Sequence, residues 1–155
     1  MAPNSLDYIT IQNTLSRYCI ALDTKDFNLL KQVFTEDCDT VYPFGGQIKG
    51  VQKVADAIQN RLKPITSQHA LTTQHIEIAA DGKTATTTTY FTGIHFGQGK
   101  WKGQEVTAWG KYMDQLVLLE GQSGGVPGSS GQWLVSKREV AFMGRLGEEG
   151  VMDGE

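Results

Sequence analysis

The hydrophobic pattern of this chain changes its period once, near Pro64, and this change limits the possible folds more than any other feature. Before Pro64, apolar residues recur every three or four positions, which is typical of amphipathic helices. After it come long strand-like runs such as residues 86–91, in which β-branched and aromatic residues predominate. Helices followed by a succession of strands indicate an α+β fold rather than a parallel α/β fold.

The N-terminal part of the chain predicts three helices. The first covers residues 4–22 and ends just before Asp23. The third covers residues 51–62, and Pro64 prevents its continuation. The elements expected between them are a short second helix capped by Asp26, a polar turn at residues 35–37 and a short strand at residues 40–43.

Four longer strands follow, and we expect them to pair as an antiparallel meander, with a hairpin turn at Asp81-Gly82. Wrapped around the three helices, a strongly curved sheet of this kind forms a cone whose mouth opens where the helices leave the sheet uncovered. The Gly- and Ser-rich residues 120–131 predict a protruding, mobile loop. The predicted strands cover residues 67–80, 83–96, 104–119 and 132–143.

The length of the chain fits one domain, which we place at residues 1–143, followed by a flexible, acidic, Gly-rich tail at residues 144–155. Of the 155 residues, 39% are hydrophobic and 20% are charged, as in an ordinary globular protein. The net charge is −3 and the basic residues are scattered, which argues against nucleic acid as a partner.

No apolar run is long enough to cross a membrane, and the first residues lack the charged-then-apolar pattern of a secretion signal. We therefore expect a cytoplasmic protein without a membrane partner. Cys19 and Cys38 do not have the spacing of metal ligands, although a disulfide between them stays possible. Phosphate-binding loops and nucleophile elbows are also missing from the sequence, so we expect no cofactor and no metal.

A spaced set of acid–base residues is the main functional signal, and His69 is its centre. An imidazole accepts a proton at neutral pH at little cost, but it needs a partner that orients it. Asp23 is the expected partner, either as that orienting carboxylate or, in a dry pocket, as the base itself. The alternatives are that His69 bonds only to backbone at a strand end and that Asp23 only caps a turn, a position for which Asp26 is better placed.

His95 shares a strand face with Phe91, so it is a candidate general acid if that face lines the cone, and an exposed residue otherwise. His75 lies six residues after His69 and shares its face in a regular strand, whereas a bulge would separate the two; we expect a structural role for His75. Tyr42 can polarise a carbonyl or serve as a core tyrosine. Asp114 faces the same way as Tyr112, where it either contacts substrate or forms an ion pair with Lys111 or Arg138.

Four short patches of this sequence have a familiar order. They are Tyr18–Phe27, which contains Asp23, then Asp39–Tyr42, Ser67–His69, and the strands that carry His95 and Asp114. Over roughly residues 9–142, the chain resembles the SnoaL-like branch of the nuclear-transport-factor-2-like superfamily. That resemblance implies the same cone-shaped α+β fold, with an antiparallel sheet around three N-terminal helices.

The relatives suggested by the resemblance are scytalone dehydratase and hexachlorocyclohexane dehydrochlorinase, in which a histidine at the position of His69 is the general base. The dehydratase has a serine where this chain has Asp114 and a tyrosine where it has Leu22, and the dehydrochlorinase lacks the second histidine. The resemblance therefore implies a proton-transfer site without a particular substrate. The catalytic residues expected are Asp23, His69, His95 and Tyr42, and the substrate-binding residues are Tyr18, Phe44, Phe91, Trp109, Tyr112 and Asp114.

Two functions follow as hypotheses. The first is a cofactor-independent lyase, isomerase or cyclase that acts on a small hydrophobic molecule of polyketide, terpenoid or aromatic type, in secondary metabolism. It includes dehydratase and polyketide cyclase chemistry. The second is a non-catalytic module of the same fold that binds a small ligand or pairs with itself. The open sheet face of this fold predicts a homodimer or a homotrimer in either case.

Overall fold

The N-terminal helix is the element against which the sheet packs. In the computed structural model, which describes residues 2–154, helix α1 covers Ser5–Thr24. The side chain of Asn4 caps it by accepting a hydrogen bond from the backbone N–H of Leu6 at 3.0 Å. Lys25 ends it in a left-handed conformation. One side of α1, which includes Leu15, Tyr18 and Leu22, is buried beneath the sheet.

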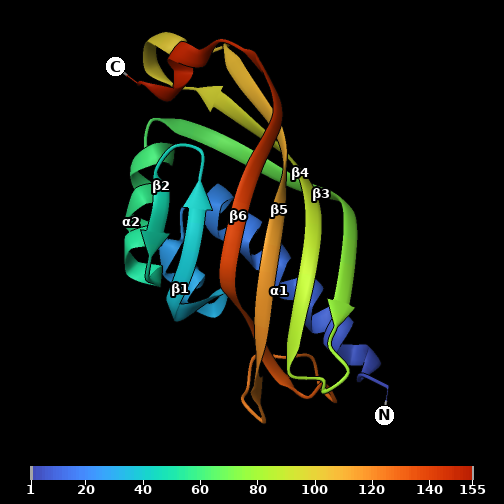
Figure 1. Ribbon diagram of the computed structural model, residues 1–155. Coiled ribbons are helices and arrows are strands. Elements are labelled where there is room, and N and C mark those ends of the chain that lie inside the picture. Colours follow the sequence, from blue (N-terminus) through green and yellow to red (C-terminus); the bar gives the residue numbers. More distant parts are fainter. Residues whose placement is uncertain (1, 155) are drawn as a thin grey trace.

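The strands form one six-stranded sheet in the order β2-β1-β6-β5-β4-β3. All neighbours are antiparallel except β1 and β6, which are parallel. Figure 1 shows the sheet curving past α1, with α2 beside β1 and β2 at one edge. The strands are β1 (Phe34–Tyr42), β2 (Gly46–Lys49), β3 (Ile65–Ile78), β4 (Thr84–Gly97), β5 (Glu105–Glu120) and β6 (Gly131–Gly147). The other helices are η1 (Phe27–Gln32), α2 (Val51–Leu62), η2 (Gly99–Trp101) and η3 (Glu149–Met152).

Two interruptions of the β5–β6 pairing, at Trp109/Gly110 and Gln115/Leu116, bend the sheet. The ring of Phe91 passes close to Gly110, where an added Cβ would lie 2.7 Å from the ring. A third irregularity lies in β3 between Leu71 and Gln74, and it leaves His75 on the exposed side. An irregularity of the strand therefore separates His69 from His75.

The first strand is longer than predicted. Residues 35–37, predicted as a polar turn, belong to β1, where they lie in the irregular stretch between Phe34 and Asp39, both of which pair with β6. The short strand β2 was not predicted at all. Its residues are mostly exposed and carry little hydrophobic signal, so only its pairing with β1 makes it a strand.

The C-terminal residues are also more ordered than predicted. Residues 144–147 extend β6, and η3 follows with Val151 fully buried. The indole N–H of Trp101 donates to the carbonyl of Gly154 at 3.0 Å, which fastens the end of the chain to the β4–β5 connection. The acidic, glycine-rich stretch predicted as a flexible tail thus contains one buried apolar side chain, that of Val151.

The loop between β5 and β6 is held against the start of α1. The side-chain amide of Asn4 donates to the carbonyl of Gly128 at 2.9 Å, and the buried Asp7 accepts from the backbone N–H of Ser130 at 2.8 Å. Cys19 and Cys38 are both buried free thiols. Within residues 2–154, no helix combines the length and the apolar character needed to cross a membrane.

Candidate active site

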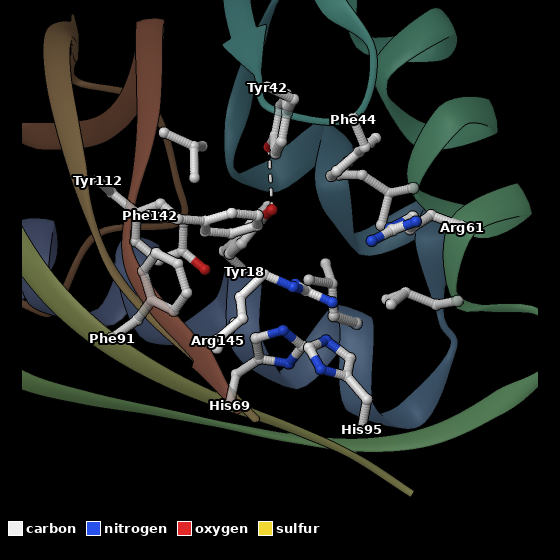
Figure 2. Close-up of a pocket in the computed structure, with 15 residues that line it drawn as sticks. Tyr18, Tyr42, Phe44, Arg61, His69, Phe91, His95, Tyr112, Phe142 and Arg145 are labelled. Carbon is white, nitrogen blue, oxygen red and sulfur yellow. Dashed lines mark hydrogen bonds between the residues drawn. The ribbon is translucent and has the colours of Figure 1, made fainter. Parts of the chain in front are cut away.

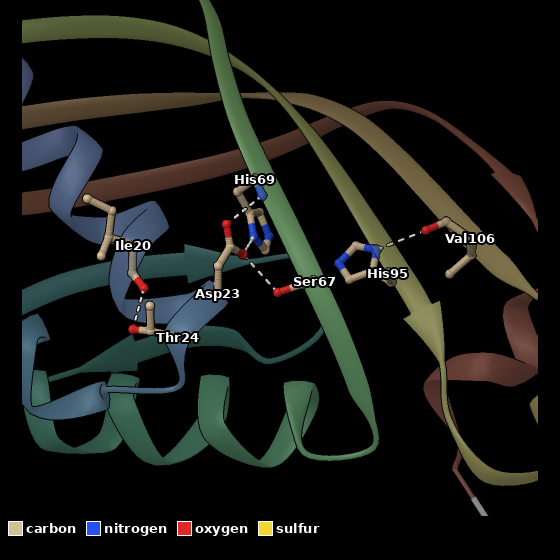
Figure 3. A network of polar contacts seen from close by, with 7 residues as sticks. All are labelled: Ile20, Asp23, Thr24, Ser67, His69, His95 and Val106. Carbon is tan, nitrogen blue, oxygen red and sulfur yellow. Dashed lines mark hydrogen bonds and ion pairs between the residues drawn. The ribbon is translucent and has the colours of Figure 1, made fainter. Parts of the chain in front are cut away.

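The end of α1 and the start of β3 bring Asp23 and His69 together. Oδ1 of Asp23 lies 2.7 Å from Nδ1 of His69, and Oδ2 accepts the backbone N–H of His69 at 2.8 Å. The hydroxyl of Ser67, on the same face of β3, donates to Oδ1 at 2.8 Å (Figure 3). Three hydrogen bonds, one from Ser67 and two from His69, therefore hold the carboxylate of Asp23 beside the imidazole of His69.

This contact determines which nitrogen of His69 carries the proton. A carboxylate only accepts hydrogen bonds, so Nδ1 is the donor and the neutral ring keeps a free lone pair on Nε2. The side chain of His69 is 7% exposed and lines a cavity, whereas that of Asp23 is 22% exposed and does not. The arrangement presents a basic nitrogen to the cavity with a carboxylate behind it.

His95 reaches the same cavity from β4. In the β3–β4 ladder His95 pairs with Ser67 and Gly93 pairs with His69, so the two histidine rings are diagonal neighbours. Their centroids are 5.7 Å apart and their planes nearly perpendicular. Nδ1–H of His95 donates to the carbonyl of Val106 at 3.1 Å (Figure 3).

The environment of His95 disfavours its charged form. Burial, with the charges of His69, Arg145 and Arg61, lowers the pKa of His95 to about 4 against the opposing hydrogen bond to Val106. The ring is therefore neutral at pH 7. Because its Nδ1 proton is committed to Val106, its Nε2 offers an acceptor.

The cavity lies between α1, α2 and the inner face of the sheet. Figure 2 shows the two histidine rings at one side, aromatic rings along another and two arginines reaching in. Its volume is about 50 Å³ and it is partly open to solvent, so any ligand larger than a few waters requires lining side chains to turn aside. The lining residues are Tyr18, Leu22, Tyr42, Phe44, Ile58, Arg61, Leu62, His69, Phe91, His95, Ala108, Tyr112, Val140, Phe142 and Arg145.

Two tyrosine hydroxyls meet at the wall opposite the histidines. The hydroxyl oxygens of Tyr18 and Tyr42 are 2.9 Å apart, so one donates to the other and the second proton is free for another acceptor. Burial raises the pKa of both tyrosines above their ordinary value, which keeps both hydroxyls protonated at neutral pH. The ring of Tyr112 packs edge-on against Tyr18 and stacks on Phe91 at 4.4 Å.

Four of the residues predicted to contact substrate line this cavity, namely Tyr18, Phe44, Phe91 and Tyr112. Trp109 lies elsewhere, because the inward residues of β5 are the even-numbered ones and Trp109 points to the outer face, where it is 38% exposed. Asp114 points inward but lies beyond the cavity. Of the six residues predicted to contact substrate, Trp109 and Asp114 are therefore the two that do not line this cavity.

Asp114 is occupied by a buried arginine. Its carboxylate accepts two hydrogen bonds from Arg138, from Nε at 2.7 Å and from Nη2 at 2.8 Å, and both side chains are fully buried. Burial alone would lower the pKa of Arg138, but the charge and hydrogen bonds of Asp114 raise it well above its ordinary value. Of the alternatives considered for Asp114, the ion pair with Arg138 is the one observed.

Sequence reasoning missed the two arginines of the cavity, Arg61 and Arg145. Arg61 follows Ile58 by three positions on the buried side of α2, so helical spacing carried a signal for it. Arg145 lay in the stretch assigned to a flexible tail, and only the extension of β6 brings it to the cavity. Within residues 2–154, no three histidine, cysteine or acidic side chains gather as a metal site would require.

The chain is similar to a known family over most of its length. A family model described as a SnoaL-like domain matches residues 3–139. No curated protein matches the chain. Similar solved structures are numerous, and at 16–17% identity those described next share the fold alone.

One similar structure is the Kfla4162 protein from Kribbella flavida, at 16% identity and a TM-score of 0.75, covering 90% of this chain and 93% of that one. A hexachlorocyclohexane dehydrochlorinase has the same identity and TM-score, with 93% and 90% covered. A candidate scytalone dehydratase from Novosphingobium aromaticivorans is 17% identical at a TM-score of 0.75, with 92% and 88% covered.

Proposed function

Because the chain belongs to the SnoaL-like family and one histidine of its cavity is held by a carboxylate, we propose that it is a cofactor-independent lyase, isomerase or cyclase. Its substrate would be a small hydrophobic molecule of polyketide, terpenoid or aromatic type. The observation that carries the proposal is the 2.7 Å contact between Asp23 and His69, with the free nitrogen of His69 at the cavity. Two similar folds are named as a dehydrochlorinase and a candidate dehydratase, and both names describe eliminations.

In the first step, Nε2 of His69 takes a proton from a carbon next to a carbonyl group or an aromatic ring. The electrons of the C–H bond move to the carbonyl oxygen, or into the ring, and form an enolate or its equivalent. Asp23 stabilises the imidazolium that results, since its carboxylate keeps the hydrogen bond to Nδ1 throughout.

The tyrosine pair suits the oxygen on which negative charge develops. One of the two hydroxyl protons of Tyr18 and Tyr42 is not used within the pair, and both groups are protonated at neutral pH. A fixed donor in a largely apolar cavity stabilises a developing oxyanion without reorganisation, and removal of one such donor typically costs about 10²–10³ in kcat.

The second step distinguishes the three reaction types. In a dehydration, the enolate re-forms its carbonyl, the carbon–oxygen bond breaks, and the leaving hydroxide takes the proton from His69 to become water. In an isomerisation, His69 returns the proton to another carbon. In a ring closure, the enolate carbon attacks a second carbonyl, whose oxygen takes that proton. In the dehydration, His95 is neutral and its Nε2 accepts a hydrogen bond from the substrate hydroxyl that leaves, which orients that group.

Hydrogen–deuterium exchange tests the first step without knowledge of the natural substrate. Small aryl ketones with acidic C–H bonds, some carrying a β-hydroxyl, are incubated with the protein in D₂O, and deuterium uptake and water loss are followed by NMR. We expect His69→Ala to abolish exchange with at least one ketone, because the accepting nitrogen is lost, while circular dichroism shows an intact fold. His75→Ala is the control, because His75 is an exposed histidine on the same strand.

Equal exchange by the wild type and His69→Ala would contradict the proposal. So would ketone binding without any exchange, which is the result expected of a non-catalytic small-ligand module.

We also propose that the protein forms a homodimer or a homotrimer through the outer face of the sheet. Tyr90, Trp109 and Leu146 are 38%, 38% and 71% exposed there, on three adjacent strands. Light scattering should give two or three times the 17.0 kDa of one chain, and a monomer at micromolar concentration would contradict this proposal.

A further inference from the structure

Two arginines reach the cavity from opposite elements of the fold. Arg61 lies in the last turn of α2, and Arg145 lies near the end of β6. Both line the cavity that contains His69 and His95, and Figure 2 shows the guanidinium of Arg145 next to the histidine rings and that of Arg61 entering from the α2 side, beside Phe44. After burial and the charge of His69, the charges of both arginines also lower the pKa of His95.

The two arginines differ in their partners. Arg145 donates two hydrogen bonds to Glu149, from Nε and Nη2, both at 2.8 Å. The guanidinium of Arg61 forms no hydrogen bond and no ion pair with any residue in the range 2–154, and lies 5.4 Å from the ring centroid of Phe44. Arg61 is nevertheless half-buried, so its donors have lost part of their water without gaining protein partners.

The acidic groups around the cavity do not neutralise Arg61. Asp23 is engaged by Ser67 and His69. Asp114 is engaged by Arg138. Glu149 and Asp153 favour the charged form of Arg61 from a distance, but burial and the neighbouring Arg145 outweigh them. The cavity therefore contains a planar fork of unused donors with a positive charge that protein groups leave uncompensated.

We propose that the ligand of this cavity carries a carboxylate group, which accepts hydrogen bonds from the guanidinium of Arg61 and is attracted by Arg145. A guanidinium matches a carboxylate in a planar, two-point contact, and such charge-assisted bonds are about twice as strong as neutral ones. The inference rests on the proposed function in one respect, since a carboxylate held at Arg61 would direct the hydrophobic part of the substrate toward the histidines.

The pair benzoate and benzamide tests the inference, because the two molecules have nearly the same shape and differ in charge at pH 7. Calorimetric titration at low ionic strength should show that benzoate binds at least tenfold more tightly than benzamide. Arg61→Gln should remove that preference, because it weakens the binding of benzoate at least tenfold and the binding of benzamide much less. Lys63→Gln is the matched control, because it removes the same charge from an exposed position two residues away and should preserve the preference.

Glu149→Gln supplies a second arm in the opposite direction. The side chain of Glu149 is 60% exposed, so its replacement does not disturb the core, and it releases Arg145 for the ligand. We expect benzoate to bind severalfold more tightly to this variant than to the wild type. A decrease in affinity would contradict the part assigned to Arg145.

Equal affinities for the two probes, including no measurable binding of either, would overturn the inference, as would a preference that survives in Arg61→Gln. Benzoate has no acidic C–H bond, so this test does not depend on proton transfer. If His69→Asn keeps the preference and the deuterium-exchange test fails, the carboxylate site stands and the proposed reaction falls. If deuterium exchange succeeds and the preference for benzoate is missing, the proposed reaction stands and the carboxylate site falls.

Discussion

At the scale of single residues, the site depends on the different hydrogen-bond partners of the two carboxylate oxygens of Asp23. Oδ2 accepts the backbone N–H of His69 and so fixes the carboxylate to β3. Oδ1 accepts from Ser67 and from the imidazole, which fixes the ring and its tautomer. Asp23 does not line the cavity, so in the proposed reaction it is a positioning residue that acts through His69.

Asp23→Asn should therefore damage catalysis more than binding. An asparagine that turns its NH₂ toward Nδ1 of His69 forces the ring proton onto Nε2, where the lone pair is needed. We expect kcat for deuterium exchange to fall by about 10²–10⁴ while KM changes less than threefold. Ser67→Ala removes one of the hydrogen bonds to Asp23 without affecting the tautomer of His69. In this variant, kcat for deuterium exchange should fall by about tenfold or less. Equal losses in the two variants would contradict the positioning role.

The low pKa of His95 makes stability depend on pH. The folded protein holds His95 neutral down to about pH 4, whereas the unfolded chain protonates it near the ordinary value of 6.5. Between these values the unfolded state binds more protons than the folded state. The contribution of neutral His95 to folding stability is therefore complete above pH 6.5 and is lost as the pH falls toward 4. The loss amounts to about 3 kcal/mol, on the scale of 1.4 kcal/mol per pKa unit.

Urea unfolding at pH 7 and pH 4.5 measures this loss. His95→Asn should reduce the difference between the two pH values, because asparagine does not titrate and its NH₂ can still donate to Val106. His75→Asn, at an exposed position, should leave the difference as in the wild type. An identical pH dependence in His95→Asn and the wild type would refute the explanation.

At the scale of elements, the β3–β4 hairpin brings the two histidines together. Its register places Gly93 opposite His69, two residues before His95. A Cβ at Gly93 would lie 3.2 Å from Cδ2 and 3.3 Å from Nε2 of His69, and 3.5 Å from Cε1 of His95. The missing side chain therefore leaves the space in which both rings fit. The backbone of Gly93 is not in the left-handed region, so its conformation is one that alanine also adopts.

Gly93→Ala should consequently move the rings without unfolding the hairpin. We expect a loss of about tenfold in the exchange rate and a change in unfolding free energy within about 1 kcal/mol, the scale on which glycine and alanine differ in regular structure. Gly144→Ala is the control, since an added Cβ there meets nothing within 4 Å. A crystal structure of Gly93→Ala with both rings unmoved would contradict the prediction.

At the scale of the whole molecule, the buried pair of Asp114 and Arg138 connects β5 and β6 to the helix layer. The guanidinium lies 4.2 Å from the ring centroid of Tyr18 on α1 and 4.1 Å from that of Tyr112. It also lies 5.4 Å from the ring centroid of Phe34 on β1. One charged group thus packs against aromatic rings from three parts of the fold, and Asp114 supplies its counter-charge.

Asp114→Ala should destabilise the fold by about 3–5 kcal/mol, because it leaves a buried arginine without its counter-charge. The double variant Asp114→Leu with Arg138→Met should recover most of that loss, since it removes both charges and fills the space. Chemical denaturation of the three proteins measures the difference. A double variant as unstable as Asp114→Ala would show that packing around Arg138, rather than its charge, is what matters.

Local periodicity alone determined much of this fold. Helix α2 has the bounds Val51–Leu62 that the sequence predicts, and β4 and β5 match within one residue at each end. Strand parity also placed His95 on the same face as Phe91, but it left open whether that face is the buried one. These features are readable because each results from the spacing of apolar residues along one element, which the chain carries wherever that element packs.

Only the tertiary structure decided the features that need two distant segments. Residues 35–37 lie within a strand because Phe34 and Asp39, on either side of them, both pair with β6, and residues 144–147 are a strand because β5 continues beside them. Arg145 reaches the cavity for that reason alone, and Asp114 is withdrawn from it by Arg138. Strand pairing, burial and charge compensation depend on contacts between distant segments. They therefore cannot be predicted from the local pattern of each element taken by itself.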